Sequence, residues 1–297
     1  MTPLRSIPRF SFCERIVMRA LFAWIVWRAT PGLLIVNGIP SPNGMTRIFD
    51  LHFLLDPQVF AWARLALAAA LLLYVARLAV WLALPVALFV HCAANAITNS
   101  QGAIQHAVQI VSLVLLAQTA AHFFGLWRRR NGEERHLLED RAIWWSQQTI
   151  VAVYLAAGIT KLFVTKGLWI YQAQWIGVGV AKSAYQSFYN TFNQADVQQQ
   201  LAVANFAASH GWIVALIAAT GLLLELGSPL MLINRVTAAL LACALIGFHI
   251  SLDYTMRLTF IYNQWLLLIF MINAPYWIVT AAQKLPGLRR AGAATSP

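Results

Sequence analysis

Long apolar runs follow one another along this chain from residue 16 to residue 281, with short polar or basic segments between them. A helix that crosses a membrane needs roughly 20 mainly apolar residues. By this length the pattern predicts eight spans, at about 16–36, 59–76, 78–97, 103–126, 144–164, 211–233, 236–256 and 258–281. We expect helices because a chain in lipid must satisfy its backbone hydrogen bonds internally, and the sequence lacks the alternating segments of a membrane barrel.

Polar and helix-breaking residues set the boundaries between the spans. Residues 59–97 are too long for one crossing, so Arg77 near their centre predicts a tight helical hairpin. Residues 37–58 are rich in Gly and Pro, and residues 127–142 are rich in charge, so both are expected to be loops. Residues 165–210, rich in Gln, Asn, Tyr and Trp, are expected to lie at the membrane interface without crossing it.

The composition agrees with a membrane protein. Of the 297 residues, 60% are hydrophobic and 10% are charged, and the mean hydropathy is +0.65. A soluble domain carries about a quarter of charged residues, so this chain cannot cover itself with a water-soluble surface. We therefore expect an all-α, polytopic membrane bundle that forms a single transmembrane domain over residues 1–297.

The net charge of +11 is explained by the orientation of the chain in the membrane and does not indicate nucleic-acid binding. Most positive residues are arginines at the ends of apolar runs, so no nucleic-acid partner is expected. Basic residues mark the cytoplasmic side of a membrane protein. In the eight-span arrangement the side of the two termini holds Arg5, Arg9, Arg15, Arg19, Arg77, Arg128, Arg129, Arg130, Arg135, Arg141, Arg235, Lys284, Arg289 and Arg290. The other side holds far fewer, so we expect a multi-pass protein of the cell membrane with both termini in the cytoplasm.

Ionisable residues at membrane depth cost about 2.5 kcal/mol or more, so each needs a structural or functional reason. Several of them fall in the outer halves of their predicted spans: Lys161, His249, Asp253, His106 and His91. Convergence at one depth is what a pocket that opens outward would need. Glu225 lies nearer the middle of its span, where we expect it to hydrogen-bond to a neighbouring helix or to stay protonated.

Two patterns have both a structural and a functional interpretation. Tyr154, Gly158 and Lys161 are spaced i, i+4, i+7 and share one helix face. Gly158 would allow either a ligand or a partner helix to approach closely, and Lys161 could line a pocket or extend to the outer interface. His249 and Asp253, spaced i, i+4, could be a structural pair, or Asp253 could orient the imidazole of His249 for acid–base chemistry.

The remaining polar residues indicate less. No metal site is expected, because nothing near His249 and Asp253 supplies a third ligand. Three cysteines without a CxxC pair indicate neither a disulfide framework nor a thiol redox centre. His91 and Asn95 are expected to form hydrogen bonds between helices, and His106 taken alone is typical of a satisfied bundle residue.

The segment around Lys161 has a recognisable pattern. It reads Tyr154-Leu-Ala-Ala-Gly158-Ile-Thr-Lys161-Leu, followed by Trp169 and Gly177. Three further segments read Phe49-Asp50-Leu-His52-Phe-Leu-Leu-Asp56-Pro57, then Leu224-Glu225-Leu226-Gly227-Ser-Pro229-Leu with Arg235 after it, and Gly247-Phe248-His249 with Phe260 to Pro275 and Trp277 after it. In this order they resemble the vitamin K-dependent γ-carboxylase-like family, which includes the bacterial HTTM-domain (horizontally transferred transmembrane domain) proteins.

The resemblance implies a membrane-embedded site that opens to the non-cytoplasmic side and oxygenates a reduced naphthoquinone of the vitamin K or menaquinol type. The strong base so formed removes a γ-proton from glutamate, to which carbon dioxide adds. Lys161 matches the lysine proposed in this family to deprotonate the hydroquinone, and an apolar bundle favours the neutral form of an amine. The candidate catalytic residues are Lys161, His249 and Asp253, and the candidate quinone-binding residues are Tyr154, Gly158, Trp169 and His106.

The chain ends soon after its last predicted span, whereas the animal carboxylases have a large extramembrane C-terminal portion that holds their protein substrate. This difference favours hydroquinone oxygenation, or a related proton abstraction, over glutamate carboxylation. We therefore expect a quinone-linked membrane enzyme of the carboxylase or epoxidase type. The alternative is a non-catalytic membrane subunit, or a partner in peptide maturation or export. In that case an extracytoplasmic peptide or protein would dock on Tyr185, Tyr189, Asn190 and Asn193. A transporter is disfavoured because the sequence lacks repeated halves.

Overall fold

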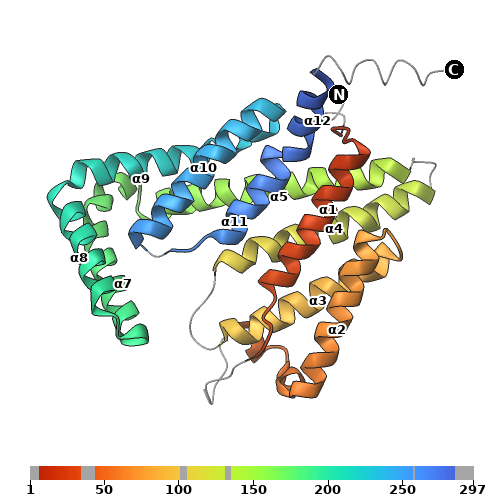
Figure 1. Cartoon of the computed structure of the whole chain (residues 1–297), viewed down its shortest axis with the longest axis horizontal. Coiled ribbons are helices and arrows are strands. Elements are labelled where there is room, and N and C mark those ends of the chain that lie inside the picture. The colour runs from red at the N-terminus through yellow and green to blue at the C-terminus, as the bar shows by residue number, and fades with distance from the viewer. Residues whose placement is uncertain (1–6, 35–43, 101–105, 131–134, 257, 285–297) are drawn as a thin grey trace. The chain divides into compact units, whose positions relative to one another are not determined.

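A computed structural model of the chain describes residues 7–34, 44–100, 106–130, 135–256 and 258–284. Every regular element within these residues is helical, so the predicted all-α class is confirmed (Figure 1). Six helices are long and apolar enough to cross a membrane: Pro57–Val75, Val80–Asn99, His106–Arg128, Leu137–Val164, Arg235–Met256 and Ile261–Ala281. A seventh candidate is the pair Val197–Ser209 and Gly211–Leu226, which is bent by 94° at its break. The protein is thus a multi-pass membrane protein, and the predicted number of eight spans is not confirmed.

The described chain folds into two compact units. The first comprises the residues up to Thr149 and those from Leu268 onward, and the second comprises Ile150–Leu267. The expectation of a single transmembrane domain stays a prediction. In the first unit lie α1 (Phe12–Ala29), α2 (Pro57–Val75), α3 (Val80–Asn99), α4 (His106–Arg130), the first half of α5 (Arg135–Val164) and α12 (Ala274–Lys284).

The predicted hairpin around Arg77 is present, because residues 76–79 connect α2 directly to α3. Arg77 and Ala79 have positive φ angles of 63° and 43°. The left-handed conformation costs about 1–3 kcal/mol for a residue with a side chain, so this short connection is strained.

The segment before α2 contains two short 3₁₀ helices, η1 (Gly44–Arg47) and η2 (His52–Leu55). Asp56 caps α2 by accepting hydrogen bonds from the backbone N–H groups of the next turn, and a proline occupies the first helical position. Asp50 accepts hydrogen bonds from the backbone N–H of His52 (3.0 Å) and from its ring Nδ1 (2.7 Å). The backbone hydrogen bond, followed by the ring hydrogen bond, lowers the pKa of Asp50 below its ordinary value.

Helix α1 differs from the predicted first span at 16–36. A capping box formed by Ser11 and Glu14 starts the helix, and it ends at Ala29 because Thr30, which precedes a proline, is extended. Residues 35 and 36 lie outside the described residues. The helix is not among the six apolar candidates, and its charged residues are Glu14, Arg15, Arg19 and Arg28.

The prediction of a solvated loop over residues 127–142 is wrong. Helices α4 and α5 cover every described residue of this segment, and α5 begins well before residue 144, the predicted start of the fifth span. The error has a physical cause. Asp140 is buried and the Glu139 side chain is 12% exposed, and both pair with arginines of a neighbouring helix, so their charges do not require full exposure to water.

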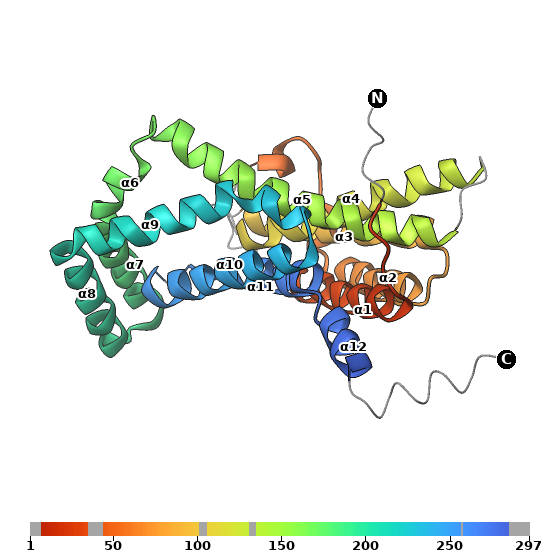
Figure 2. The ribbon, with the colours of Figure 1, turned by 90° about the horizontal axis from the view of Figure 1, so that it is seen from above.

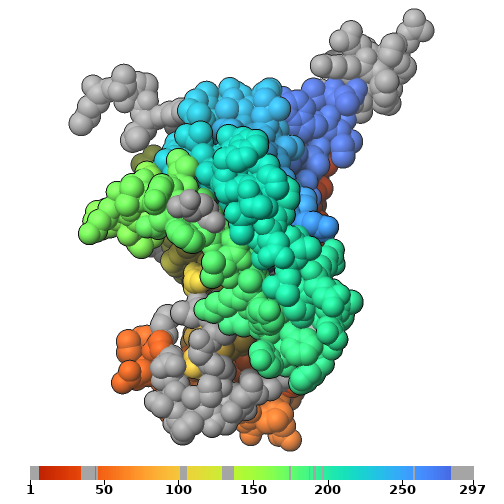
Figure 3. Space-filling view, turned by 90° about the vertical axis from the view of Figure 1, so that its left-hand side faces the viewer, coloured from red at the N-terminus to blue at the C-terminus, as the bar shows by residue number. Residues whose placement is uncertain are grey.

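The second unit holds most of the segment that the sequence placed at the interface. It comprises the second half of α5, α6 (Trp169–Gln172), η3 (Ala173–Trp175), α7 (Ile176–Thr191), α8 (Gln194–Ser209), α9 (Gly211–Leu226), η4 (Ser228–Leu232), α10 (Arg235–Met256) and α11 (Ile261–Leu266). Helices α7 and α8 lie side by side as a hairpin in Figures 1 and 2, and Figure 3 shows the surface that they form.

Two predicted spans of the C-terminal half differ from the observed helices. The span at 211–233 is shorter, because α9 ends at Leu226 and the Ser228-Pro229 pair starts the 3₁₀ helix η4. The last span, at 258–281, is interrupted: α11 continues into a π-helical segment, η5 (Leu267–Ile272), and Asn273 with a φ of 55° separates it from α12. Together these pieces still form one candidate span, Ile261–Ala281.

Candidate functional site

Lys161 and Glu225 form an ion pair in the second unit. Lys161 lies near the end of α5, and Glu225 lies near the end of α9. The Nζ atom of Lys161 is 2.5 Å from Oε1 and 2.6 Å from Oε2 of Glu225. The hydrogen bond predicted from Glu225 to a neighbouring helix is therefore confirmed. The contact gives the amine of Lys161 and the carboxylate of Glu225 each a partner of opposite charge within the unit.

Gly158 allows α5 and α9 to approach at this pair. A Cβ atom on Gly158 would lie 3.0 Å from Cδ2 of Leu226 and 3.2 Å from Cβ of Glu225. The sequence left open whether a ligand or a partner helix approaches Gly158. In the structure it is a partner helix, α9. The missing side chain of Gly158 thus brings the carboxylate of Glu225 within reach of Lys161.

Trp169 also contacts the amine. The Nζ atom of Lys161 lies 5.4 Å from the centroid of the Trp169 ring, within the range of a cation–π interaction. The side chain of Lys161 is 26% exposed and that of Glu225 is 7% exposed. The ammonium group therefore has two partners and remains partly open, whereas the carboxylate is almost enclosed.

Tyr154 and His249 form a second polar pair in the same unit. The Tyr154 hydroxyl on α5 lies 2.8 Å from Nε2 of His249 on α10, and both residues are buried. When the phenol donates this hydrogen bond, Nε2 is the acceptor and Nδ1 carries the hydrogen of the neutral ring. The ring of Phe260 packs against the imidazole with centroids 4.9 Å apart.

The predicted pairing of His249 with Asp253 is not present. Oδ1 of Asp253 instead accepts a hydrogen bond of 2.7 Å from the hydroxyl of Thr259. The hydrogen-bond partner of the imidazole is instead Tyr154, which comes from another helix and contacts Nε2. Asp253 therefore does not orient the imidazole, and its catalytic role stays a prediction without this geometric support.

Two buried polar atoms near the Tyr154–His249 pair lack a partner. Nδ1 of His249 and Oδ1 of Asn263 make no hydrogen bond among the described residues. Asn263 lies on α11, close to the Tyr154 hydroxyl. Since buried polar groups are nearly always hydrogen-bonded, a water or a polar ligand atom is expected at this position.

The first unit contains the other histidines singled out by the sequence. His106 begins α4, is exposed and makes no hydrogen bond within the described chain, so its assignment as a quinone-binding residue stays a prediction. The expected contacts of His91 and Asn95 between helices are confirmed. Nδ1 of His91 lies 2.8 Å from the Thr30 hydroxyl, and the Asn95 amide donates to the carbonyl of Ala29 (3.2 Å).

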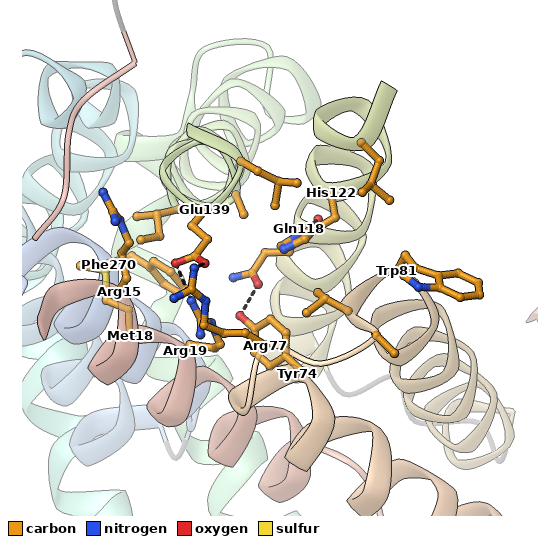
Figure 4. Close-up of a pocket in the computed structure, with 16 residues that line it drawn as sticks. Arg15, Met18, Arg19, Tyr74, Arg77, Trp81, Gln118, His122, Glu139 and Phe270 are labelled. Atoms are coloured by element: carbon orange, nitrogen blue, oxygen red, sulfur yellow. Dashed lines mark hydrogen bonds and ion pairs between the residues drawn. The ribbon is translucent and has the colours of Figure 1, made fainter. Parts of the chain in front are cut away.

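A cavity in the first unit was not predicted from the sequence. Its volume is about 290 Å³, and its lining comes from α1, the α2–α3 hairpin, α4, α5 and η5 (Figure 4). The charged lining residues are Arg15, Arg19, Arg77 and Glu139. Figure 4 shows Glu139 directed toward the arginines, with Tyr74 and Gln118 joined by a hydrogen bond beside them.

Two carboxylates organise these arginines. Glu139 pairs with Nη2 of Arg19 (2.7 Å) and also with Arg77. Asp140, which is fully buried, accepts two hydrogen bonds from Arg15, of 2.8 Å and 3.2 Å. Three segments that the sequence assigned to one side of the membrane are thereby joined at one end of the first unit.

A signal for this cluster is present in the sequence. Arg15 and Arg19 are spaced i, i+4, which places them on one helix face. Glu139 and Asp140 directly precede an apolar run on the same predicted side of the membrane. Complementary charges at matching depth indicate ion pairs between helices, and this pattern could have identified the contact before the structure did.

Comparisons with protein-family models, with curated proteins and with solved structures find no match to this chain. The resemblance to the γ-carboxylase-like family therefore stays a prediction from the short segments described above.

Proposed function

We propose that this protein is a quinone-linked enzyme of the cell membrane in which the Lys161–Glu225 pair takes up a proton from a reduced naphthoquinone. The observation that carries this proposal is the pair itself, with an amine and a carboxylate 2.5 Å apart and the amine partly exposed. The resemblance of the segment from Tyr154 to Lys161 to the carboxylase-like family supplies the reaction class by analogy.

The two members of the pair have different tasks in this proposal. The carboxylate of Glu225 can accept a proton at Oε1 or Oε2 as a general base. The ammonium of Lys161 can stabilise the negative charge that develops when a nearby hydroxyl loses its proton. The pair then carries a net positive charge, which further favours an anion beside Nζ. Lys161 thus acts together with Glu225 and not as an isolated neutral amine.

The surroundings of the pair fit a naphthoquinone. Trp169 offers an aromatic face beside Lys161. The imidazole of His249 packs against Phe260, and its Nδ1, which has no partner among the described residues, can donate a hydrogen bond to a quinone oxygen. Asn263 offers an unpaired acceptor nearby. When bound, a reduced naphthoquinone supplies the hydroxyl protons and the electrons for the reaction with oxygen.

The proposal includes an orientation with both termini in the cytoplasm. The excess of arginines on the side of the termini supports it. The ion pairs of Arg15, Arg19 and Arg77 with Glu139 and Asp140 agree, because they join segments assigned to the same side. In the arrangement expected from the sequence, Lys161 falls in the outer half of its span, and we propose that the site opens to the non-cytoplasmic side.

The test uses the purified chain in lipid nanodiscs with a reduced menaquinone analogue and oxygen. One oxygen atom of O₂ enters the quinone epoxide and the other leaves as water, so mass spectrometry of the quinone reports the reaction. We expect epoxide from the wild type and a loss of about 100-fold or more in rate for Lys161→Met. The matched control is Lys182→Met, because Lys182 is an exposed lysine of α7 in the same unit. This variant should retain the rate.

Two results would contradict the proposal. One is the absence of epoxide from folded wild-type protein with menaquinone and with ubiquinone analogues. The other is an unchanged rate for Lys161→Met while circular dichroism shows native helicity.

Exposed aromatic residues on α7 favour a second function, that of a non-catalytic subunit. Tyr185 and Tyr189 are 52% and 72% exposed and lie four residues apart on one helix face. Exposed tyrosines are typical of protein interfaces. Of the predicted docking residues, Asn193 accepts a hydrogen bond from the backbone of Ala195 (3.2 Å), and the side chain of Asn190 lies outside the described residues.

Purification from the native membrane in a mild detergent tests this second function. The subunit function predicts a stoichiometric partner that is lost when Tyr185 and Tyr189 are both replaced by serine. Recovery of the chain alone as a monodisperse species would count against it.

A further inference from the structure

The cavity of the first unit combines a cationic wall with an apolar wall. Its cations are Arg15, Arg19 and Arg77, and its apolar lining includes Met18, Leu126, Ile143 and Phe270 (Figure 4). The volume of about 290 Å³ is many times the ~30 Å³ that a water molecule occupies in the liquid. Such a lining suits a ligand that is anionic at one end and apolar at the other.

The charges around the cavity do not balance. Glu139 is a shared partner of Arg19 and Arg77, and Asp140 is the partner of Arg15. Among the described residues of this cluster, three guanidinium groups therefore face two carboxylates, which leaves an excess of one positive charge. An anionic group in the cavity would complete the pairing.

Arg19 and Arg77 also have N–H donors that are not used in the contacts described above. A guanidinium group has five N–H donors. Arg77 pairs with Glu139 through Nη2, and its side chain makes no other hydrogen bond among the described residues. Arg19 donates to Glu139 and to the carbonyl of Val75 (3.4 Å). The planar donor groups that remain match the oxygens of a phosphate.

The position of Arg77 is maintained at a conformational cost. This residue has a φ of 63° in the four-residue connection between α2 and α3, and its side chain is 38% exposed. Strained backbone of this kind concentrates at ligand-binding sites, because surrounding contacts must hold it in place. Here the strained connection directs a cation toward the cavity.

A buried histidine adds a polar group to the lining. His122 is 8% exposed, and its Nδ1 donates to the carbonyl of Gln118 (2.9 Å), since a carbonyl can only accept. Nε2 has no hydrogen-bond partner among the described residues. The Gln118 side chain is itself fixed between Tyr74 (2.5 Å) and Ser146 (3.1 Å), so this wall of the cavity is preorganised.

We propose that this cavity binds the phosphate group of an anionic amphiphile, with Arg15, Arg19 and Arg77 on the phosphate and the apolar wall on the chain. An anionic phospholipid of the cytoplasmic leaflet has this chemistry, and basic pockets between helices on that side suit lipid headgroups. The inference does not depend on the quinone reaction, because it concerns residues of the first unit only.

The test is native mass spectrometry of the full-length chain in detergent, with phosphatidylglycerol, phosphatidylcholine or inorganic phosphate added. Phosphatidylglycerol should bind more tightly than phosphatidylcholine, and Arg77→Gln should weaken it by about tenfold, as expected for one charge-assisted contact. Arg47→Gln is the matched control, because Arg47 is exposed in η1 and does not line the cavity. It should change the affinity by less than about twofold.

The arms of the experiment separate the two sources of a phosphate. Binding of phosphatidylglycerol without competition from inorganic phosphate identifies a lipid. Binding of inorganic phosphate alone, with the same dependence on Arg77, identifies a soluble phosphate-bearing ligand. If Arg77→Gln does not stay folded, His122→Phe removes the Nε2 atom and should weaken the same binding. Equal binding of the two lipids, or equal effects of Arg77→Gln and Arg47→Gln, would overturn the proposal.

Discussion

At the scale of single residues, the Lys161–Glu225 contact makes each side chain depend on the other. Removing one partner of a buried ion pair leaves the other without compensation. We expect Lys161→Met to lower the free energy of unfolding by about 1.5–3 kcal/mol, the range of a hydrogen bond to a charged group. Glu225→Gln should cost less, because the amide oxygen can still accept from Nζ. Thermal unfolding in detergent measures both.

The controls for this prediction use the same unit. Lys182→Met removes an exposed lysine and should leave the unfolding midpoint unchanged. Lys161→Met combined with Glu225→Leu removes both charges and should recover part of the loss. A Lys161→Met midpoint equal to that of the wild type would show that the ion pair contributes nothing.

The residues of the site were predictable from the sequence, but their partners were not. Tyr154, Gly158 and Lys161 share a helix face by spacing alone, and all three contact residues of other helices in the second unit. The partner Glu225 is 64 residues from Lys161, and spacing reports only neighbours on the same helix. For the same reason the sequence paired His249 with Asp253 and missed Tyr154.

At the scale of elements, the α7–α8 hairpin depends on one glycine. A Cβ atom on Gly177 would lie 2.9 Å from the carbonyl oxygen of Ala204, a backbone atom that cannot rotate away. We expect Gly177→Ala to separate the two helices and to destabilise the hairpin by about 1–3 kcal/mol. Hydrogen exchange of the α7 and α8 amides, read by mass spectrometry, measures the change.

Gly179 provides a matched control for this prediction. It lies two residues after Gly177 in α7, and a Cβ atom there would meet nothing within 4 Å. Gly179→Ala should leave exchange unchanged or slow it, because alanine favours a helix over glycine by up to about 1 kcal/mol. Equal exchange in the two variants would contradict the close packing of α7 on α8.

Element boundaries were predictable where local signals decide them and were wrong where tertiary contacts do. The α2–α3 hairpin follows from a basic residue at the centre of a long apolar run. The described residues of the charged segment 127–142 are helical, and their carboxylates, Glu139 and Asp140, pair with Arg15, Arg19 and Arg77. The end of α9 at Leu226 also departs from the prediction, although Pro229 is a local signal for it.

At the scale of the whole molecule, α1 joins the helices of the first unit despite its charges. Its N-terminal arginines pair with Glu139 and Asp140, and the residues at its other end contact His91 and Asn95 within α3. Its 18 residues extend about 27 Å, close to the thickness of a bilayer core. We therefore expect α1 to cross the membrane with its polar groups paired inside the unit.

If α1 crosses the membrane, the side on which the C-terminus lies depends on whether the bent pair α8–α9 also crosses. The six candidate spans and α1 make an odd number, so both termini share one side only if the pair at Val197–Ser209 and Gly211–Leu226 also crosses. Single cysteines at Lys182 and at Leu230, in a chain without Cys13, Cys92 and Cys243, test this requirement. A membrane-impermeant maleimide should label position 182 in intact cells, and position 230 only after permeabilisation.

Labelling of both positions in intact cells would show that the bent pair enters and leaves on one side. The number of crossings could not be decided from the sequence, because it depends on a 94° bend between two helices that hydropathy alone cannot distinguish from a straight span. The fold class was decided by composition and the length of the apolar runs, which need no tertiary information.

The central claim is that Lys161 and Glu225 act as one proton-accepting unit. The most direct measurement is the single-turnover rate of quinone epoxide formation in the wild type, Lys161→Met, Glu225→Gln and the double variant. We predict that each single variant loses about 100-fold or more, and that the double variant is no slower than the slower single one, because residues acting as a unit are not additive. Losses that multiply in the double variant, or a wild-type rate in either single variant, would contradict the account.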